Sequence, residues 1–166
     1  MKIGIISDTH DDIDNIKKAV KIFNDKGIKT VIHLGDIVAP PAIKFFKGFK
    51  LIGIFGNNDG YKQFLLETYR SIGGDLKGDF ASVEIDGLKL ALYHGEFPDI
   101  TKALVKSGDY DFVLSGHTHT ANVTKADKTI LVNPGSAHRF FTNDTGPTLA
   151  VLDTVSKEVE IIMIGK

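Results

Sequence analysis

The chain contains neither cysteine nor tryptophan, and its formal net charge of -1 leaves almost no excess of either sign. The lack of cysteine excludes disulfides, iron–sulfur clusters and thiolate zinc sites, so any bound metal must use nitrogen and oxygen ligands. The near-zero charge gives no bulk attraction to nucleic acid or to anionic membranes, although it is compatible with a local basic groove. No apolar run is long enough to span a membrane, so we expect no membrane partner.

What remains is the composition of an ordinary globular protein, with 42% hydrophobic and 25% charged residues. Neither a Pro/Ser-rich linker nor an internal repeat divides the 166 residues, so we expect a single domain over 1–166. The apolar stretch at 3–6 is short and runs directly into polar residues, which is typical of a first strand rather than a signal peptide. We therefore expect a cytoplasmic protein.

Short apolar runs alternate with helical periodicity in the first half of the chain. The pattern predicts strands at 3–6, 31–34 and 51–55, and helices at 11–25, after Pro40-Pro41 and at 61–72. Gly27 is expected to end the first helix. Strand–helix alternation with short connections indicates right-handed crossovers and a mainly parallel sheet.

The second half is richer in hairpin signals. Asp86-Gly87 joins runs at 80–85 and 88–93, and Asp127-Lys128 joins runs at 123–126 and 129–132. Further strands are expected at 112–114, 148–152 and 159–164, with a helix at 99–106. A parallel half followed by hairpins predicts an α/β fold in which two sheets pack together with helices outside, a four-layer α/β/β/α sandwich.

Metal-binding residue types directly follow five of the apolar runs. In order they are Asp8 and His10, Asp36, Asn57, His94, and His117 with His119. The ends of strands that point the same way converge on one edge of a sheet, where α/β folds bind their ligands. Seven nitrogen and oxygen ligands are enough for two metal ions, which makes a hydrolytic dimetal site the leading hypothesis.

Each motif also has a simpler interpretation when it stands alone. Asp8 could be a helix N-cap, although Asp11 or Asp12 could serve that helix instead. In extended geometry the side chains of Asp8 and His10 would point the same way and reach one metal. Gly-Asp at Asp36 is usually a turn, 56–60 reads as a loop, and a single His94 is more often structural. The pair His117 and His119 is the strongest signal, and the joint occurrence of all the motifs favours the metal site.

Two further histidines receive other expectations. His33 lies inside a predicted strand, so we expect it to pack in the interior or to support a ligand. His138 follows the Asn133-Pro134-Gly135-Ser136 turn, which could place it near the site as a source of the leaving-group proton.

The full motif set resembles that of the calcineurin-like metallophosphoesterases: Asp-x-His, Gly-Asp, Gly-Asn-x-Asp, His and Gly-His-x-His, with Asn-Pro-Gly-Ser at 133–136. Its short length and Ser7-Asp8-Thr9-His10 start are most similar to the compact YfcE-type branch, so the resemblance implies a bare catalytic core. It also implies that Asp8, His10 and His119 hold one metal, that Asn57, His94 and His117 hold a second, and that Asp36 bridges them. A hydroxide between the metals would then hydrolyse a phosphate ester, most plausibly a diester.

Two chemical details qualify this expectation. The ligand set suits Mn, Ni, Fe, Co or Zn, with Mg as a weaker alternative. Many members of the resembled family carry His after the ligand Asn, but here the position is Asn58, which donates a hydrogen bond and has no proton to transfer. Asp36 and Asn58 are therefore the catalytic candidates, and esters with poor leaving groups should react slowly.

The alternatives are a phosphomonoesterase, a nuclease or a non-catalytic protein-binding scaffold of the same fold. A nuclease needs a basic track, whereas the sequence offers scattered lysines with Arg70 and Arg139, so nucleic acid is a disfavoured partner. A scaffold predicts eroded ligands, whereas all seven positions carry usable residues. The expected partner is a small or exposed phosphate ester, and self-association into a homo-oligomer stays open.

Overall fold

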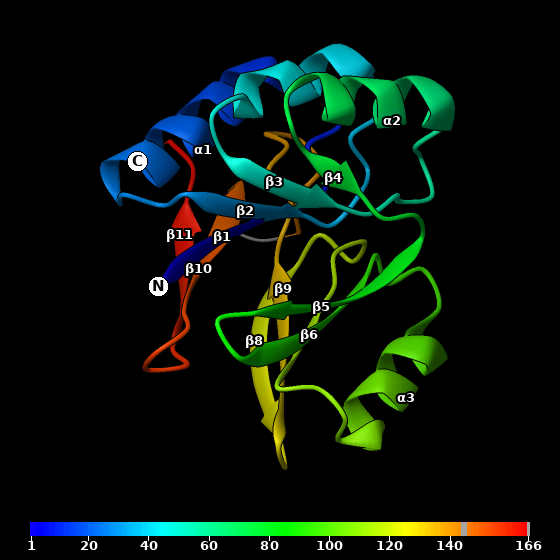
Figure 1. Ribbon diagram of the computed structural model, residues 1–166, viewed down its shortest axis with the longest axis vertical. Coiled ribbons are helices and arrows are strands. Elements are labelled where there is room, and N and C mark those ends of the chain that lie inside the picture. Colours follow the sequence, from blue (N-terminus) through cyan, green and yellow to red (C-terminus); the bar gives the residue numbers. More distant parts are fainter. Residues whose placement is uncertain (144–145, 166) are drawn as a thin grey trace.

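Two mixed β-sheets that face each other form the centre of the molecule (Figure 1). The computed structural model describes residues 1–143 and 146–165. Asp144, Thr145 and Lys166, which also belong to the expected 1–166 domain, lie outside the described residues. The strand order is β11-β10-β1-β2-β3-β4 in one sheet and β5-β6-β7-β9-β8 in the other.

The first sheet brings the ends of three parallel strands to one edge. Its members are β1 (Lys2–Ile6), β2 (Thr30–His33), β3 (Lys50–Gly53), β4 (Asp75–Leu76), β10 (Thr148–Asp153) and β11 (Val159–Met163). Ile5 of β1 pairs with Ile32 of β2, which pairs with Ile52 of β3, so the chain leaves these strands at the same level. Strand β10 runs antiparallel to β1 and β11. The short β4 is a strand that the sequence pattern missed.

The second sheet contains both expected hairpins. They are formed by β5 (Phe80–Ile85) with β6 (Leu88–Tyr93), and by β8 (Ala121–Ala126) with β9 (Thr129–Pro134). Strand β7 (Phe112–Leu114) lies between them and is parallel to both β6 and β9. The second half therefore also has parallel pairings, which the hairpin signals alone did not predict.

Helices complete the predicted four layers. The helices α1 (Ile13–Asp25) and α2 (Lys62–Ser71) and the segment Pro40–Phe46 cover the outer face of the first sheet (Figure 1). The segment Pro40–Phe46 is a 3-10 helix, η1. One hydrophobic core lies beneath these helices and a second lies between the sheets. The fourth layer is the single helix α3 (Pro98–Ser107), which contacts β7 and β9 and buries none of its residues fully.

The first helix shows how the sequence sets the local structure next to the site. Asp12, and not Asp8, is the N-cap of α1, and its carboxylate accepts a hydrogen bond from the N–H of Asn15 at 3.2 Å. Ile16 and Phe23 are among the residues that the helix buries against the first sheet. Gly27 follows in the left-handed conformation, as expected for a helix end. Asp8 is thereby left available for another role.

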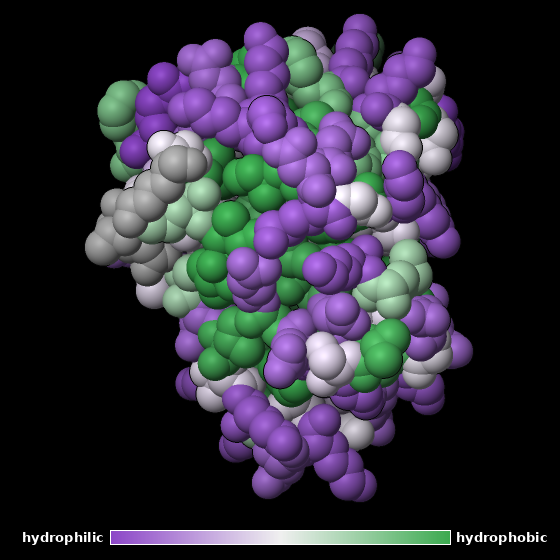
Figure 2. All heavy atoms as spheres, turned by 90° about the vertical axis from the view of Figure 1, so that its left-hand side faces the viewer, coloured by the Kyte–Doolittle hydropathy of each residue, from purple (hydrophilic) through white to green (hydrophobic). Residues whose placement is uncertain are grey.

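The outer surface is mixed in polarity. On the side that faces left in Figure 1, a hydrophobic band lies between hydrophilic side chains (Figure 2). Its hydrophobic character fits β11, an edge strand whose Ile161 and Ile162 are only partly buried. Within 1–143 and 146–165, no helix is both long enough and apolar enough to cross a membrane.

Candidate metal centre

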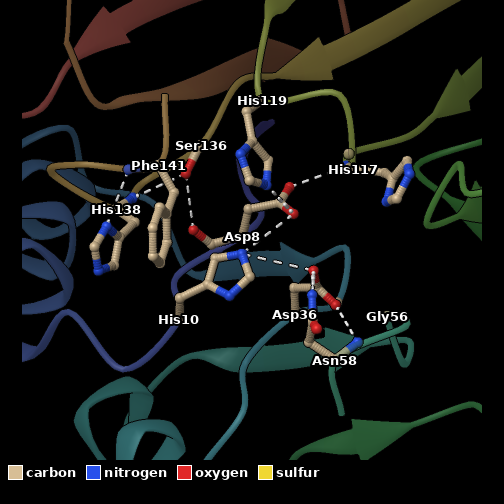
Figure 3. Close-up of polar contacts among 12 residues, drawn as sticks. Asp8, His10, Asp36, Gly56, Asn58, His117, His119, Ser136, His138 and Phe141 are labelled. Carbon is tan, nitrogen blue, oxygen red and sulfur yellow. Dashed lines mark hydrogen bonds and ion pairs between the residues drawn. The ribbon is translucent and has the colours of Figure 1, made fainter. Parts of the chain in front are cut away.

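The sequence-predicted ligands follow β1, β2 and β3 of the first sheet and β6 and β7 of the second, so the site lies where the ends of the two sheets meet rather than at the edge of one sheet. Asp8, His10, Asp36 and His119 each offer one ligand atom, and these atoms all lie within 4.8 Å of one another. Figure 3 shows their side chains turned toward a common centre. The convergence expected from parallel strand ends is therefore present.

Two carboxylates lie at the middle of this group. Asp8 Oδ1 is 3.2 Å from His119 Nε2, 3.8 Å from His10 Nε2 and 3.9 Å from His94 Nε2. Asp36 Oδ2 is 3.5 Å from His94 Nε2 and 3.6 Å from His10 Nε2. His10 and His94 thus face both carboxylates, as residues around a pair of cations would.

The remaining two ligand candidates lie beside His94. The ring of His117 is 5.3 Å from that of His94, and its Nδ1 is 2.9 Å from the Oδ1 of Asn57. All seven predicted ligand positions are therefore brought together, with Asn57 and His117 joined to the rest through His94.

Unpartnered buried atoms test whether the site fits metal ions. Asp8 Oδ1, His10 Nε2 and His94 Nε2 are buried and have no hydrogen-bond partner among the described residues. Leaving such atoms unpaired is costly. The Nε2 atoms of His10 and His94 lie 3.5–3.9 Å from the two carboxylates, too far for hydrogen bonds, and the nearest neighbour of Asp8 Oδ1 is His119 Nε2 at 3.2 Å. Divalent cations with a preference for nitrogen and oxygen ligands would satisfy all three atoms. The residues present fit the metals that the sequence predicts.

Hydrogen bonds from outside the centre orient the ligands. His94 Nδ1 lies 2.7 Å from the carbonyl oxygen of Leu34, so this nitrogen carries the proton and leaves Nε2 free to act as a ligand. Burial lowers the pKa of His94, but its close contact with the Asp36 carboxylate and the charges of Asp8 and Asp36 outweigh this and raise the pKa to about 9.

Asn58 holds the proposed bridging carboxylate. Its backbone N–H donates to Asp36 Oδ1 at 2.8 Å, and its Nδ2 donates to Asp36 Oδ2 at 2.7 Å. Burial raises the pKa of Asp36, but the close contact and charge of His94 and the hydrogen bonds from Asn58 prevail and hold this pKa well below its usual value. A Cβ on Gly56 would collide with the Asp36 carboxylate, which explains glycine at that position.

The backbone geometry differs from the extended form that we expected for Asp8 and His10. Both have positive φ, 52° and 39°, as do Asp36, His117 and His119. The ligand pairs converge because the chain turns sharply after each strand, and not because alternate residues of a strand share a face. Non-glycine residues in this region are strained, and such strain is concentrated at functional sites.

Asp59 is a structural element of the site that the sequence reading overlooked. Its buried carboxylate accepts backbone N–H bonds from Asp36, Ile37, Val38 and Gly56 at 2.7–3.0 Å. It therefore ties the loop after β2 to the loop after β3. The sequence shows Asp59 as the last residue of the Gly-Asn-x-Asp motif. A buried carboxylate needs several hydrogen-bond donors, and here the backbone N–H groups of the two loops supply them.

His33 is fully buried, and it connects two ligand loops. Its Nδ1 accepts a hydrogen bond from Gly35 N–H at 3.2 Å, so its Nε2 carries the proton and donates to Thr9 Oγ1 at 3.1 Å. Burial lowers the pKa of His33 to about 3, which keeps the ring neutral near neutral pH. These contacts agree with the supporting role expected from its place in a strand.

The turn at 133–136 places His138 near the site, as expected, with its ring 6.0 Å from that of His10. Ser136 Oγ donates to the carbonyl oxygen of Asp8 at 3.0 Å and accepts from His138 N–H at 3.1 Å. His138 Nδ1 accepts from the N–H groups of Phe140 and Phe141. Protonation of that nitrogen would break both bonds, and burial also lowers the pKa of His138. His138 is therefore a poor source of the leaving-group proton.

A cavity of about 400 Å3 adjoins the His94 and His117 side of the centre. It is lined by Gly95 and Gly116, which neighbour these histidines, and by Pro98, Thr118 and Asn133 among others. The cavity offers space for one substituent of a ligand held at the metal ligands.

The fold and the site together define a two-sheet α/β protein with a candidate carboxylate–histidine metal centre where the ends of the two sheets meet. The chain belongs to the calcineurin-like phosphoesterase superfamily, whose domain model matches residues 1–157. It is 42% identical over 167 residues to a phosphodiesterase of Methanocaldococcus jannaschii, with 99% of each chain covered.

Solved structures agree with this assignment. An archaeal structure described as a novel phosphodiesterase has 43% identity and a TM-score of 0.91, with 98% of this chain and 99% of that chain covered. Yfce, a phosphoesterase from E. coli, has a TM-score of 0.71 at 17% identity, with 99% of this chain and 100% of that chain covered. At that identity the likeness to Yfce concerns the fold alone. It agrees with the compact branch that the motifs resemble.

Proposed function

We propose that the protein is a metal-dependent phosphodiesterase with a dinuclear centre. The observation that carries the proposal is the set of buried, unpartnered ligand atoms on Asp8, His10 and His94, which face a common centre. The archaeal matches above, in sequence and in structure, are described as phosphodiesterases and cover nearly the whole chain, which supports the preference for diesters.

The proposed assignment of ligands follows the two groups of side chains. Asp8, His10 and His119 would hold one cation, Asn57, His94 and His117 would hold the other, and Asp36 would contact both. Bound divalent cations supply charge neutralisation of the phosphoryl oxygens and activation of water. The nitrogen-rich set favours Mn, Ni, Fe, Co or Zn over Mg.

The protein's own residues position this chemistry. Asn58 fixes both oxygens of Asp36, and Leu34 fixes the ring of His94, so neither ligand must reorganise when a cation binds. Neither the Asn58 amide nor the neutral His138 ring is a good proton donor to a leaving oxygen. The leaving group must then carry most of its negative charge itself.

Hydrolysis of bis(4-nitrophenyl) phosphate tests the proposal. Chelation should abolish turnover, and Mn or Ni should restore it better than Ca, which prefers more oxygen ligands. Parallel assays with 4-nitrophenyl phosphate and single-stranded DNA distinguish a diesterase from a monoesterase or a nuclease. Full activity of the metal-free protein would refute metal dependence, and the absence of turnover with every metal would leave a scaffold as the better interpretation.

A variant pair locates the centre. Asp36→Asn should lose at least as much activity as His10→Ala and bind fewer than two metals per chain, because Asp36 would contact both cations in the proposed assignment. Asp99→Asn removes an exposed carboxylate on α3 and is the matched control. If Asp36→Asn keeps two metals and normal turnover, the assignment of the bridge is wrong.

A further inference from the structure

We infer that Phe141 is a stacking surface for an aromatic substituent of the bound phosphate ester, an inference that rests on the proposed function. Phe141 has 53% of its surface exposed. A single exposed aromatic residue is ordinary, so exposure alone decides nothing. The orientation of the ring and its place beside the metal ligands carry the argument.

One face of Phe141 is already covered. Its ring stacks on His138 with centroids 4.3 Å apart and an interplanar angle of 17°. Because the ring is nevertheless half exposed, most of the exposed area belongs to its edge and to its other face. Figure 3 shows the ring of Phe141 beside His138 and near His10, so its exposed part borders the ligand cluster.

The distance from the ring of Phe141 to the metal-ligand candidates suits an ester substituent. The ring of Phe141 is 5.4 Å from that of His10, and the ring of His10 is 5.5 Å from that of His119. A phosphoryl group held at the Nε2 atoms of these histidines would therefore place a directly attached ring within contact of Phe141. Asn58 contacts Asp36 on the side away from Phe141 (Figure 3), so the second substituent of a diester would extend in a different direction from the first.

The surface is also fixed in place before any ligand arrives. Arg139 donates from its backbone N–H and its Nε to Asp12 Oδ2 at 2.9 and 2.8 Å, and its Nη2 donates to Oδ1. This anchors the segment to the N-terminus of α1, while His138 Nδ1 accepts the N–H of Phe141 at 3.2 Å. A preorganised ring loses little freedom on binding, so more of the stacking energy contributes to affinity.

The ligand chemistry that matches is a planar aromatic group one or two bonds from a phosphoryl centre, such as an aryl ester or a nucleobase-bearing ester. Removing the aromatic residue from a base–aromatic stack lowers the affinity by roughly fivefold or more. The free face carries no hydrogen-bonding group, so it would favour aromatic over alkyl substituents without selecting one base.

Binding of two phosphonates tests this inference without requiring turnover. The Kd values of phenylphosphonate and methylphosphonate are measured by calorimetry on Mn-loaded protein, because neither C–P bond is hydrolysed by a phosphodiesterase. Wild-type protein should bind phenylphosphonate more tightly. Phe141→Leu should weaken phenylphosphonate by about fivefold or more and leave methylphosphonate unchanged. Phe141→Tyr should restore the preference.

Phe140→Leu is the matched control, because Phe140 is a neighbouring aromatic with 79% of its surface exposed. It should bind both phosphonates as the wild type does. No phenyl preference in the wild type, no binding of either compound, or equal weakening of both by Phe141→Leu would each overturn the inference. A Phe141-dependent preference in a protein that hydrolyses no ester would preserve the stacking surface and refute the proposed function instead.

Discussion

His33 should make the stability of the metal-free protein depend on pH in a defined window. In the unfolded chain the ring titrates near its ordinary pKa of 6.5, whereas burial lowers its pKa to about 3 in the folded protein. As the pH falls below 6.5, the His33 ring becomes protonated in the unfolded chain but stays neutral in the folded protein. The contribution of His33 to stability is therefore present above pH 6.5 and is lost as pH falls toward about 3.

The size of the effect follows from these two pKa values. A shift of one pKa unit corresponds to about 1.4 kcal/mol, so lowering the pH from 7 to 5 should cost about 2 kcal/mol through His33 alone. Other groups titrate in the same range, but they are common to the wild type and to His33→Gln. The difference between the two proteins isolates the histidine.

Urea denaturation in the presence of a chelator measures this difference. His33→Gln should be less stable than the wild type at pH 7, because it keeps at most one of the bonds to Thr9 and Gly35, and the gap should narrow by about 2 kcal/mol at pH 5. His33→Asn, which can reach Gly35 rather than Thr9, should show the same narrowing. A gap that stays constant from pH 7 to pH 5 in both variants would refute a buried, neutral His33. With metal bound, His33→Gln should keep turnover within about tenfold, since His33 does not touch the centre.

Two further predictions concern Asp59 and Asn58. Asp59→Asn turns an amide NH2 toward two of the four backbone N–H groups that donate to the carboxylate. Urea denaturation should therefore show that the free energy of unfolding falls by about 3 kcal/mol, and a fall below about 1 kcal/mol would contradict the role of Asp59 in joining the loops. For Asn58, wild-type turnover should fall steeply as the pKa of the leaving group rises, and Asn58→His should recover part of the roughly 10²–10⁴-fold that acid catalysis supplies. Asn58→Ala should cost much less than the loss of a metal ligand. A flat wild-type dependence, with chemistry shown to be rate-limiting, would mean that another residue supplies the proton.

The layers of the fold could be predicted because local patterns determine them. The apolar runs, the Asp86-Gly87 hairpin and the amphipathic face of α1 agree with the structure to within a few residues. Strand β4 was missed because two residues of sheet, Asp75 and Leu76, leave no periodicity to detect. The parallel pairing of β7 with β6 and β9 was missed because pairing between distant segments depends on the whole sheet.

The candidate site was predictable in its residue types and less so in its geometry. Asp8 and His10 were expected to converge by the alternation of an extended strand, whereas both lie in left-handed turns. The φ angle of a loop residue is set by the surrounding contacts, so it could not be inferred from spacing. Phe141 also carried no signal, because its role depends on the stack with His138.

The left-handed backbone at the ligand positions also restricts how this protein can change over evolutionary time. A β-carbon in that conformation costs roughly 1–2 kcal/mol, and only glycine, Asn and Asp tolerate it with ease. If metal binding were no longer selected, substitution of His117 or His119 by glycine would relieve strain and stabilise the fold. The ligands would thus be lost by substitutions that favour stability, so their presence together indicates continued selection for what they bind.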